Sequence, residues 1–312
     1  MISRKIPVSI GIDLGGTMIK GVLMQHDGTI LNQLIRETQD EGKAAVFSWK
    51  EGIKAVVSEL KPKGKANIPI GICAPGLPDA QHQSIAYMPG RLQGLEHLNW
   101  GEYLAETQVY VLNDANAAMM AEHQFGAGIG KQHLVLLTLG TGVGGAIIID
   151  RKLYKGWLNR AGHLGHLSQH PFGEAGIVNL PGTLEMAIGN ATVSERSKGR
   201  FKSTYELVEG YKKGDAWASL VWLESIKNLA TGISSLINIL SPELIILSGG
   251  IIQAEEALFQ PLATFMDLFE WRPGDQPTPI VKAHFTAFAG AVGAASFARE
   301  KARAIEGPSH HT

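Results

Sequence analysis

The sequence has little of what secreted and membrane proteins depend on. Its 312 residues include a single cysteine, Cys73, so a disulfide framework is excluded and a reducing compartment is favoured. The N-terminus lacks the apolar stretch of a signal peptide, and no run approaches the ~18 consecutive apolar residues that span a bilayer. We therefore expect a cytoplasmic protein, in which Cys73 is a small buried side chain.

An excess of charge of either sign is also absent. The formal net charge is −1, and no long basic run offers the attraction that nucleic acid or an anionic membrane surface requires. Only seven residues precede the first predicted strand, which leaves no room for an N-terminal DNA-binding domain. We expect neither nucleic acid nor a membrane as a partner.

A glycine-rich turn between two apolar strands is the most informative feature that is present. Asp13 ends the strand that starts at Val8, and Gly15, Gly16 and Thr17 form the turn. Backbone N–H groups of such a turn can approach an anion closely, the threonine hydroxyl adds a donor, and the aspartate can hold a hydrated Mg²⁺. An ordinary tight turn with a capping aspartate would explain the segment as well.

A second segment, from Leu134 to Tyr154, repeats this plan with Gly140, Thr141 and Gly142 in its turn. Two such hairpins predict a duplicated domain whose halves bind one polyphosphate from opposite sides. The glycines also match a dinucleotide-binding fingerprint, but the residues after them are β-branched rather than helical. No acidic residue stands ~20 positions further on to hold a ribose, so we do not expect a nicotinamide cofactor.

Apolar periodicity predicts a mixed α/β chain of ample hydrophobic content, 45% of the residues, with no Ser/Pro-rich linker between its halves. We place the boundary near residue 115 because of the duplication. The expected strands cover 8–12, 19–24, 30–34, 68–72, 109–112 and 244–247, and the expected helices cover 46–60, 115–125, 216–240, 258–268 and 290–305.

Asp114 lies at the carboxyl end of the predicted strand 109–112, where side chains face a ligand cleft in α/β folds. A carboxylate there suits the general base of phosphoryl transfer to a hydroxyl group, a reaction in which the protein mainly positions the reactants. The N-cap of the Ala-rich helix that follows is an equally good interpretation of the same residue.

Both turns, together with several shorter motifs, resemble the ROK family of sugar kinases, repressors and uncharacterised reading frames. The resemblance covers most of the chain, and the order of the motifs is specific. These motifs are Pro75-Gly76, Asn113-Asp114-Ala115-Asn116, Gly162-His163-Leu164-Gly165-His166, Leu184-Glu185 and Gly249-Gly250.

The resemblance implies two ribonuclease-H-like domains of the actin/hexokinase ATPase type around a deep cleft. The first would comprise residues 1–115 and 290–312, and the second residues 116–289. It also implies Asp114 as the catalytic base, ATP and Mg²⁺ as cofactors, and a homodimer. The implied sugar ligands are Gly76, Arg91, Asn113, His163, His166 and Glu185, and the implied ATP and Mg²⁺ ligands are Asp13, Gly15, Gly16, Thr17, Lys20, Gly140, Thr141, Gly142, Gly249 and Gly250.

Three departures from the family pattern concern the substrate. His163 stands where family kinases usually carry a glutamate, and an imidazole offers one donor and one acceptor where a carboxylate accepts twice. Arg91 stands in place of an asparagine, which suits an acidic sugar or is a solvated surface residue. The cysteines of the family's zinc cluster are absent, so we expect no structural zinc, although His163, His166 and His170 could form a three-imidazole site.

The sequence therefore predicts an ATP-dependent sugar kinase that phosphorylates a hydroxyl of a hexose or hexose derivative, similar to glucokinase. A catalytically silent sugar-binding or regulatory protein of the same fold is the alternative, because one carboxylate of the family's sugar site is missing.

Overall fold

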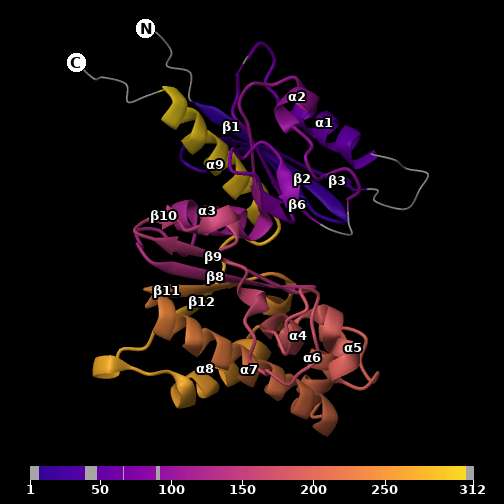
Figure 1. The fold of residues 1–312 in the computed structure, drawn as a ribbon, viewed down its shortest axis with the longest axis vertical. Coiled ribbons are helices and arrows are strands. Elements are labelled where there is room, and N and C mark those ends of the chain that lie inside the picture. Colours follow the sequence, from indigo (N-terminus) through magenta and orange to yellow (C-terminus); the bar gives the residue numbers. More distant parts are fainter. Residues whose placement is uncertain (1–6, 39–47, 66, 89–91, 307–312) are drawn as a thin grey trace. The chain divides into compact units, whose positions relative to one another are not determined.

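The computed structural model describes residues 7–38, 48–65, 67–88 and 92–306. The chain divides into two compact units, of which the first comprises Met1–Ile129, Lys155–Arg160 and His284–Thr312, and the second comprises Gly130–Tyr154 and Ala161–Ala283 (Figure 1). Within the described ranges, no helix has the length and apolar character needed to cross a membrane.

The first unit is built on a five-stranded sheet in the order β3-β2-β1-β4-β7. The three strands nearest the N-terminus pair antiparallel, and β4 and β7 add in parallel. The strands are β1 (Val8–Leu14), β2 (Met18–Gln25), β3 (Ile30–Glu37), β4 (Ile70–Ala74) and β7 (Val109–Asn113), with a separate hairpin of β5 (Leu77–Pro78) and β6 (Ile85–Tyr87).

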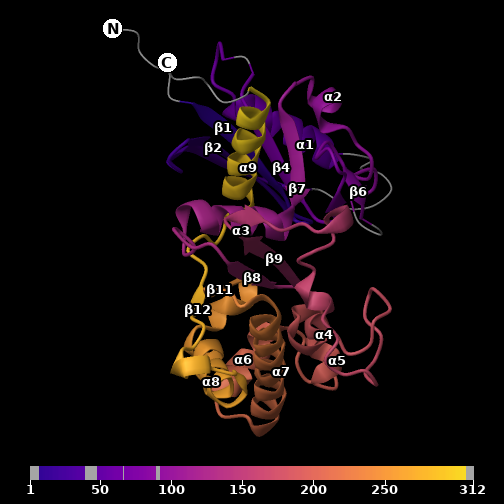
Figure 2. The same cartoon turned by 60° about the vertical axis from the view of Figure 1, so that its left-hand side comes forward.

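Successive side chains of a strand point to opposite faces of the sheet, and apolar side chains of these strands lie on both faces. One face packs against α1 (Ser48–Leu60) and α2 (Trp100–Leu104), with Ile12 and Ile72 in the shared core. The other face packs against α9 (Ala289–Glu306), which lies along β1 and β4 in Figures 1 and 2. Residues 46–47 of the helix predicted from 46 to 60 lie outside the described residues.

Glycines let α9 approach the sheet closely. A Cβ built on Gly11 of β1 would stand 1.8 Å from the carbonyl oxygen of Ala291, and one on Gly71 of β4 would stand 1.9 Å from that of Ala294. Since neither distance leaves room for any side chain, the backbone of α9 rests directly on the two strands.

The second unit repeats the first, with a five-stranded sheet in the order β10-β9-β8-β11-β12 and the same change from antiparallel to parallel pairing. The predicted duplication is thereby confirmed. The strands are β8 (Leu134–Leu139), β9 (Val143–Ile149), β10 (Lys152–Leu153), β11 (Leu244–Ser248) and β12 (Ile280–Lys282), and the helices are α4 (Leu184–Ile188), α5 (Val193–Arg196), α6 (Thr204–Lys212), α7 (Ala216–Leu240) and α8 (Glu256–Phe269). Short 3₁₀ turns cover Trp157–Asn159, Leu164–His166, Asn190–Thr192, Gly250–Ala254 and Pro273–Asp275.

The helix α3 (Asp114–Phe125) belongs to the first unit, whereas the boundary predicted near residue 115 assigns nearly all of it to the second domain. The physical reason is its packing on α9, where a Cβ on Gly293 would stand 1.7 Å from the carbonyl oxygen of Ala117. The buried carboxylate of Glu122 then accepts the N–H groups of Ala127 at 2.9 Å, His284 at 3.1 Å and Phe285 at 2.7 Å. The Glu122 carboxylate therefore connects two stretches of the first unit that are far apart in the sequence.

Candidate active site

The first glycine-rich turn connects β1 to β2 and is stabilised by its neighbours. The Gly15 N–H donates to the Met18 carbonyl at 3.0 Å, and the Thr38 hydroxyl donates to the Gly15 carbonyl at 2.7 Å. Gly16 and Thr17 complete the turn, and Thr17 is exposed. The predicted phosphate turn thus has a fixed backbone with its threonine side chain at the surface.

Asp13 lies at the end of β1 and is half-buried beside the turn. Burial raises the pKa of its carboxyl group, while the charge of Lys20, its cross-strand partner, and a hydrogen bond from the Cys73 thiol at 3.5 Å oppose the rise. Cys73 is buried, as predicted, and burial with the charges of Asp13 and Asp114 keeps the pKa of its thiol well above the usual value. Asp13 and Lys20 are therefore brought together at this turn.

Asn113, and not Asp114, is the N-cap of α3. Its side-chain oxygen accepts the N–H groups of Ala115 at 2.9 Å and Asn116 at 3.4 Å, and its amide donates to the Gly76 carbonyl at 3.1 Å. The capping interpretation of Asp114 is therefore wrong, because the cap falls one residue earlier. Gly76 has a φ of 103°, a conformation that favours glycine.

The carboxylate of Asp114 is in the first turn of α3 and open to solvent. The pKa of this carboxyl group is nevertheless raised to about 6. The main cause is that the surrounding protein displaces part of its hydrating water, and the second cause is the negative charge of Asp13. A carboxylate with a pKa shifted toward neutrality is suited to exchange a proton with a ligand. Arg91, the remaining predicted sugar ligand of this unit, lies outside the described residues.

The second glycine-rich turn connects β8 to β9 and is held by the segment that follows α4. Gly140 and Thr141 accept the N–H groups of Asn190 and Ala191, each at 2.9 Å. Glu185 accepts the N–H of Val143 at 3.3 Å, and a Cβ on Gly142 would stand 2.3 Å from its carboxylate. Glu185, predicted as a sugar ligand, therefore lies against this turn.

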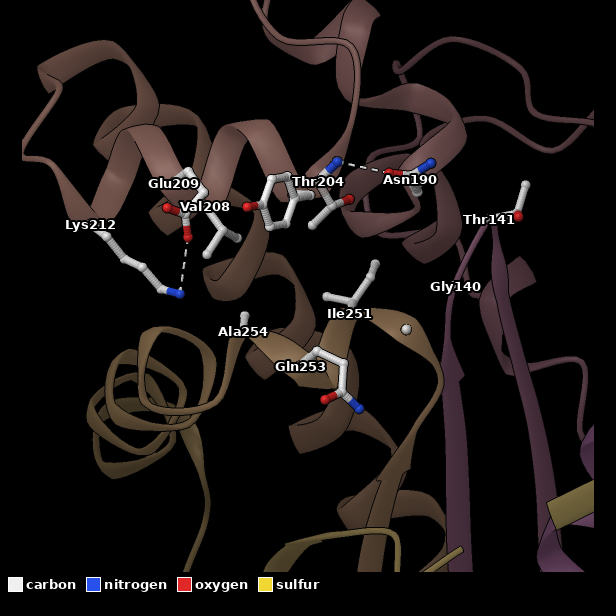
Figure 3. A pocket seen from close by; sticks show the side chains of 12 residues that line it. Gly140, Thr141, Asn190, Thr204, Val208, Glu209, Lys212, Ile251, Gln253 and Ala254 are labelled. Carbon is white, nitrogen blue, oxygen red and sulfur yellow. Dashed lines mark hydrogen bonds and ion pairs between the residues drawn. The ribbon is translucent and has the colours of Figure 1, made fainter. Parts of the chain in front are cut away.

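A cavity of about 500 Å³ opens beside this turn (Figure 3). Gly140 and Gly250 lie on its wall, and a Cβ on either would meet no atom within 4 Å. Gly249 has a φ of 92° and turns the chain at the end of β11. The other lining residues are Thr141, Asn190, Thr204, Tyr205, Val208, Glu209, Lys212, Ile251, Gln253 and Ala254. The cavity thus joins two predicted nucleotide segments of the second unit, Gly140–Gly142 and Gly249–Gly250.

His163 and His166 lie together in the second unit, with ring centroids 5.6 Å apart and planes inclined by 18°. Burial, followed by the neighbouring His166, lowers the pKa of His163, so its imidazole is neutral near pH 7. His170 instead contacts the Asn228 side-chain oxygen at 2.9 Å. Among the residues that the structure describes, no three side chains of the metal-ligating types form a cluster.

Asn190 and Thr204 are lining residues that sequence reasoning missed. They come from the 3₁₀ turn after α4 and the first turn of α6, which lie far from both glycine-rich turns along the chain. A polar residue at the start of an ordinary amphipathic helix gives no periodic signal. The local sign of a helix start there is Ser203, which accepts the Glu206 N–H as the N-cap of α6, with Glu206 three residues later, and it indicates a helix but no ligand site.

Comparisons with known proteins agree with the motifs. A family model described as "ROK family" matches residues 9–301. The glucokinase of Thermotoga maritima is 30% identical, over 94% of this chain and 97% of its own length. The DNA-binding transcriptional dual regulator NagC of Escherichia coli is 26% identical, over 74% of this chain and 60% of its own length.

A crystal structure of a ROK family glucokinase from Streptomyces griseus, in complex with glucose and AMPPNP, has the same fold. It matches with a TM-score of 0.77 and 25% identity, over 94% of this chain and 99% of that chain. The predicted α/β fold of the actin/hexokinase ATPase type is therefore confirmed.

Proposed function

The chain belongs to the ROK family, and from that premise we propose that it is an ATP-dependent sugar kinase. It transfers the γ-phosphoryl group of Mg·ATP to a hydroxyl group of a hexose or hexose derivative. The observation that carries the proposal is Asp114, a solvent-open carboxylate beside Asp13 whose pKa is raised to about 6. Such a group accepts the proton of the attacking hydroxyl, which is the one proton transfer that the reaction needs.

The residues of the second unit fit a nucleotide. The open space at Gly140 and Gly250 admits a ligand where a side chain would stand. Asp13 suits Mg²⁺, which proteins often hold through one or two carboxylates together with substrate phosphates and water. Bound Mg·ATP would supply the phosphoryl group and screen its charge. Gly15, Gly16, Thr17 and Lys20 are proposed to contact the same phosphates.

For the sugar, we propose Gly76, Arg91, Asn113, His166 and Glu185 as ligands. Asn113 positions Asp114 through the helix cap, so any movement of its amide would also move the base. His163 is a further proposed ligand. Its neutral imidazole offers one donor and one acceptor, so it favours a different hydroxyl pattern from the one that a carboxylate would bind.

The raised pKa of Asp114 predicts an acid limb in the pH dependence of turnover. A base accepts a proton only while it is ionised, so kcat/KM for the sugar rises with pH and levels off above the pKa. The limb lies near pH 6 in the free enzyme, and a cation held by Asp13 moves it lower because it favours the ionised form. Initial rates from about pH 5 to about pH 8 measure the limb, and rates that fall with rising pH contradict a carboxylate base.

Sugar-dependent release of ADP from Mg·ATP tests the proposed activity. The panel comprises hexoses, N-acetylhexosamines and sugar acids, each against a reaction without sugar. We expect at least one sugar to raise the rate clearly above that background, and its class identifies the acceptor. If calorimetry detects sugar binding but no sugar stimulates ADP release, the protein is the silent sugar binder or regulator.

We further propose a cytoplasmic homodimer, as the family resemblance implies.

A further inference from the structure

We infer that Arg196 is a positioning residue of the donor site. Its guanidinium group fixes the segment 189–192, and this segment holds the second glycine-rich turn in the conformation that binds the donor phosphates. The inference rests on the proposed function. It assigns a role in donor binding to a residue that is not part of the wall of the cavity in Figure 3.

Arg196 ends α5, and its guanidinium group donates hydrogen bonds to three different parts of the second unit. Its Nε atom donates to the Thr192 hydroxyl at 3.2 Å, its Nη2 atom donates to the Gly189 carbonyl at 2.9 Å, and its Nη1 atom donates to the Ser225 hydroxyl. Ser225 is buried on α7. The planar guanidinium group therefore ties both ends of the segment 189–192 to the long helix of this unit.

This segment in turn holds the second glycine-rich turn through its backbone. The N–H groups of Asn190 and Ala191 donate to the carbonyls of Gly140 and Thr141, each at 2.9 Å. Because a peptide bond is planar and trans, the N–H group that shares a plane with each of these carbonyls points the opposite way. Two of the N–H groups proposed to bind phosphate, those of Thr141 and Gly142, are thereby directed away from the segment.

Loss of the guanidinium group would remove the hydrogen bonds that anchor the segment at Gly189 and Thr192. A Cβ on Gly189 would stand only 2.9 Å from the Thr141 carbonyl oxygen, so the segment touches the turn and its displacement is transmitted to the turn. A peptide plane that rotates presents a carbonyl oxygen where an N–H group had been, and this oxygen repels a phosphate instead of binding it. Arg196 thus acts on the donor through the segment and without contacting the phosphates.

The guanidinium group can be reached from a second cavity. This cavity has a volume of about 580 Å³, and Arg196, Ser225 and Asn228 are among its lining residues. Burial lowers the pKa of Arg196 to about 10, so the side chain stays positively charged near pH 7. A small planar cation that enters this cavity can therefore replace the guanidinium group when the side chain is removed.

The Arg196→Met variant removes the guanidinium group and keeps an unbranched side chain, and Arg196→Lys keeps the positive charge without the planar group. Calorimetry with Mg²⁺ measures the binding of ADP and of pyrophosphate to the wild type and both variants. We expect both variants to bind both ligands about tenfold more weakly, because the lost hydrogen bonds act on the turn that holds the phosphates. Thermal unfolding establishes that each variant is folded at the temperature of the binding measurement.

Arg200→Met is the matched control. Arg200 is an exposed arginine of the same unit, and its guanidinium group pairs with Asp215. Its replacement should leave the affinities for ADP and pyrophosphate unchanged.

The Arg196→Ala variant tests the guanidinium group directly. It should bind Mg·ADP weakly, and millimolar guanidinium chloride, far below the concentrations that unfold proteins, should restore most of the affinity. Sodium chloride at the same concentration controls for ionic strength and should restore none of it. A merely structural role of the side chain in folding would not respond to the added cation.

Four outcomes would overturn the inference. They are wild-type affinity for ADP in folded Arg196→Met, wild-type affinity in Arg196→Lys, a loss for ADP with none for pyrophosphate, and a folded Arg196→Ala protein that guanidinium does not restore. A wild-type protein that binds neither ADP nor pyrophosphate contradicts the proposed kinase function itself, and so separates the two failures.

Discussion

Replacement of Asp114 by asparagine is expected to lower sugar-dependent turnover by roughly a thousandfold, because a positioned general base contributes about 10² to 10⁴ in rate. The amide has nearly the same shape but cannot take up the hydroxyl proton. The Asp114 carboxylate accepts the neighbouring Ala115 N–H at 2.8 Å and a hydrogen bond from the Asn113 side chain, both of which an asparagine oxygen can also accept. The loss should therefore appear in kcat, with ADP affinity and Tm close to those of the wild type.

An exposed aspartate of the same unit provides the matched control. Asp27, in the turn between β2 and β3, accepts the Thr29 N–H at 3.0 Å, a bond that an asparagine oxygen also accepts. Asp27→Asn should therefore leave the rate unchanged. If Asp114→Asn keeps more than about a tenth of wild-type turnover, Asp114 is not the base. If it loses ADP binding as well, the carboxylate acts in nucleotide binding rather than in proton transfer.

Strand and helix positions were largely predictable because the burial pattern repeats along each element. The apolar strand β1, which carries Asp13 near its end, has a buried face toward α1, and the duplicated hairpin at Gly140 gives the same sheet order in the second unit. A glycine-rich turn after an apolar strand has few alternative structures, so both turns were found from local sequence alone. The position of Asp114 was also predictable from local sequence, because it directly follows the apolar residues of β7.

Residues whose roles depend on distant segments were not predictable. Thr204 reaches the cavity wall because its N–H donates to the Asn190 side chain, whose own N–H donates to the Gly140 carbonyl, and no local pattern connects these three residues. Glu122 lies in the predicted Ala-rich helix with no local sign of a special role, yet it is buried and accepts the backbone N–H groups of His284 and Phe285, 162 and 163 positions later in the chain. Tertiary contacts of this kind determine to which unit α3 belongs. They cannot be predicted from the helix propensity or the apolar periodicity of the local sequence.

Replacing the glycines of the sheet that contact α9 is expected to destabilise the protein strongly. Such replacements test the packing of α9 on the sheet of the first unit. Replacing Gly71 by alanine would place a Cβ 1.9 Å from the Ala294 carbonyl oxygen and 2.3 Å from its carbon. Both are backbone atoms of a helix, so no rotamer change relieves the overlap, and α9 must move away from β4. Overpacking by one methyl group typically costs about 1–3 kcal/mol, and we expect about 4 kcal/mol or more where the clash is with backbone.

Calorimetric unfolding measures this effect, and Gly52→Ala in α1 is the control. A Cβ at Gly52 meets only the Ile19 Cδ1 atom at 2.9 Å, the end of a side chain that can turn aside, and alanine favours a helix by about 1 kcal/mol over glycine. Gly52→Ala should therefore unfold close to the wild-type temperature, while Gly71→Ala should lower Tm by roughly 10 °C or more. Gly11→Ala on the adjacent strand should act like Gly71→Ala, since its Cβ would stand 1.8 Å from the Ala291 carbonyl oxygen. Wild-type stability in both strand variants would mean that α9 does not rest on the sheet, and that Asp13, which α9 meets at Gly290, is positioned by other contacts.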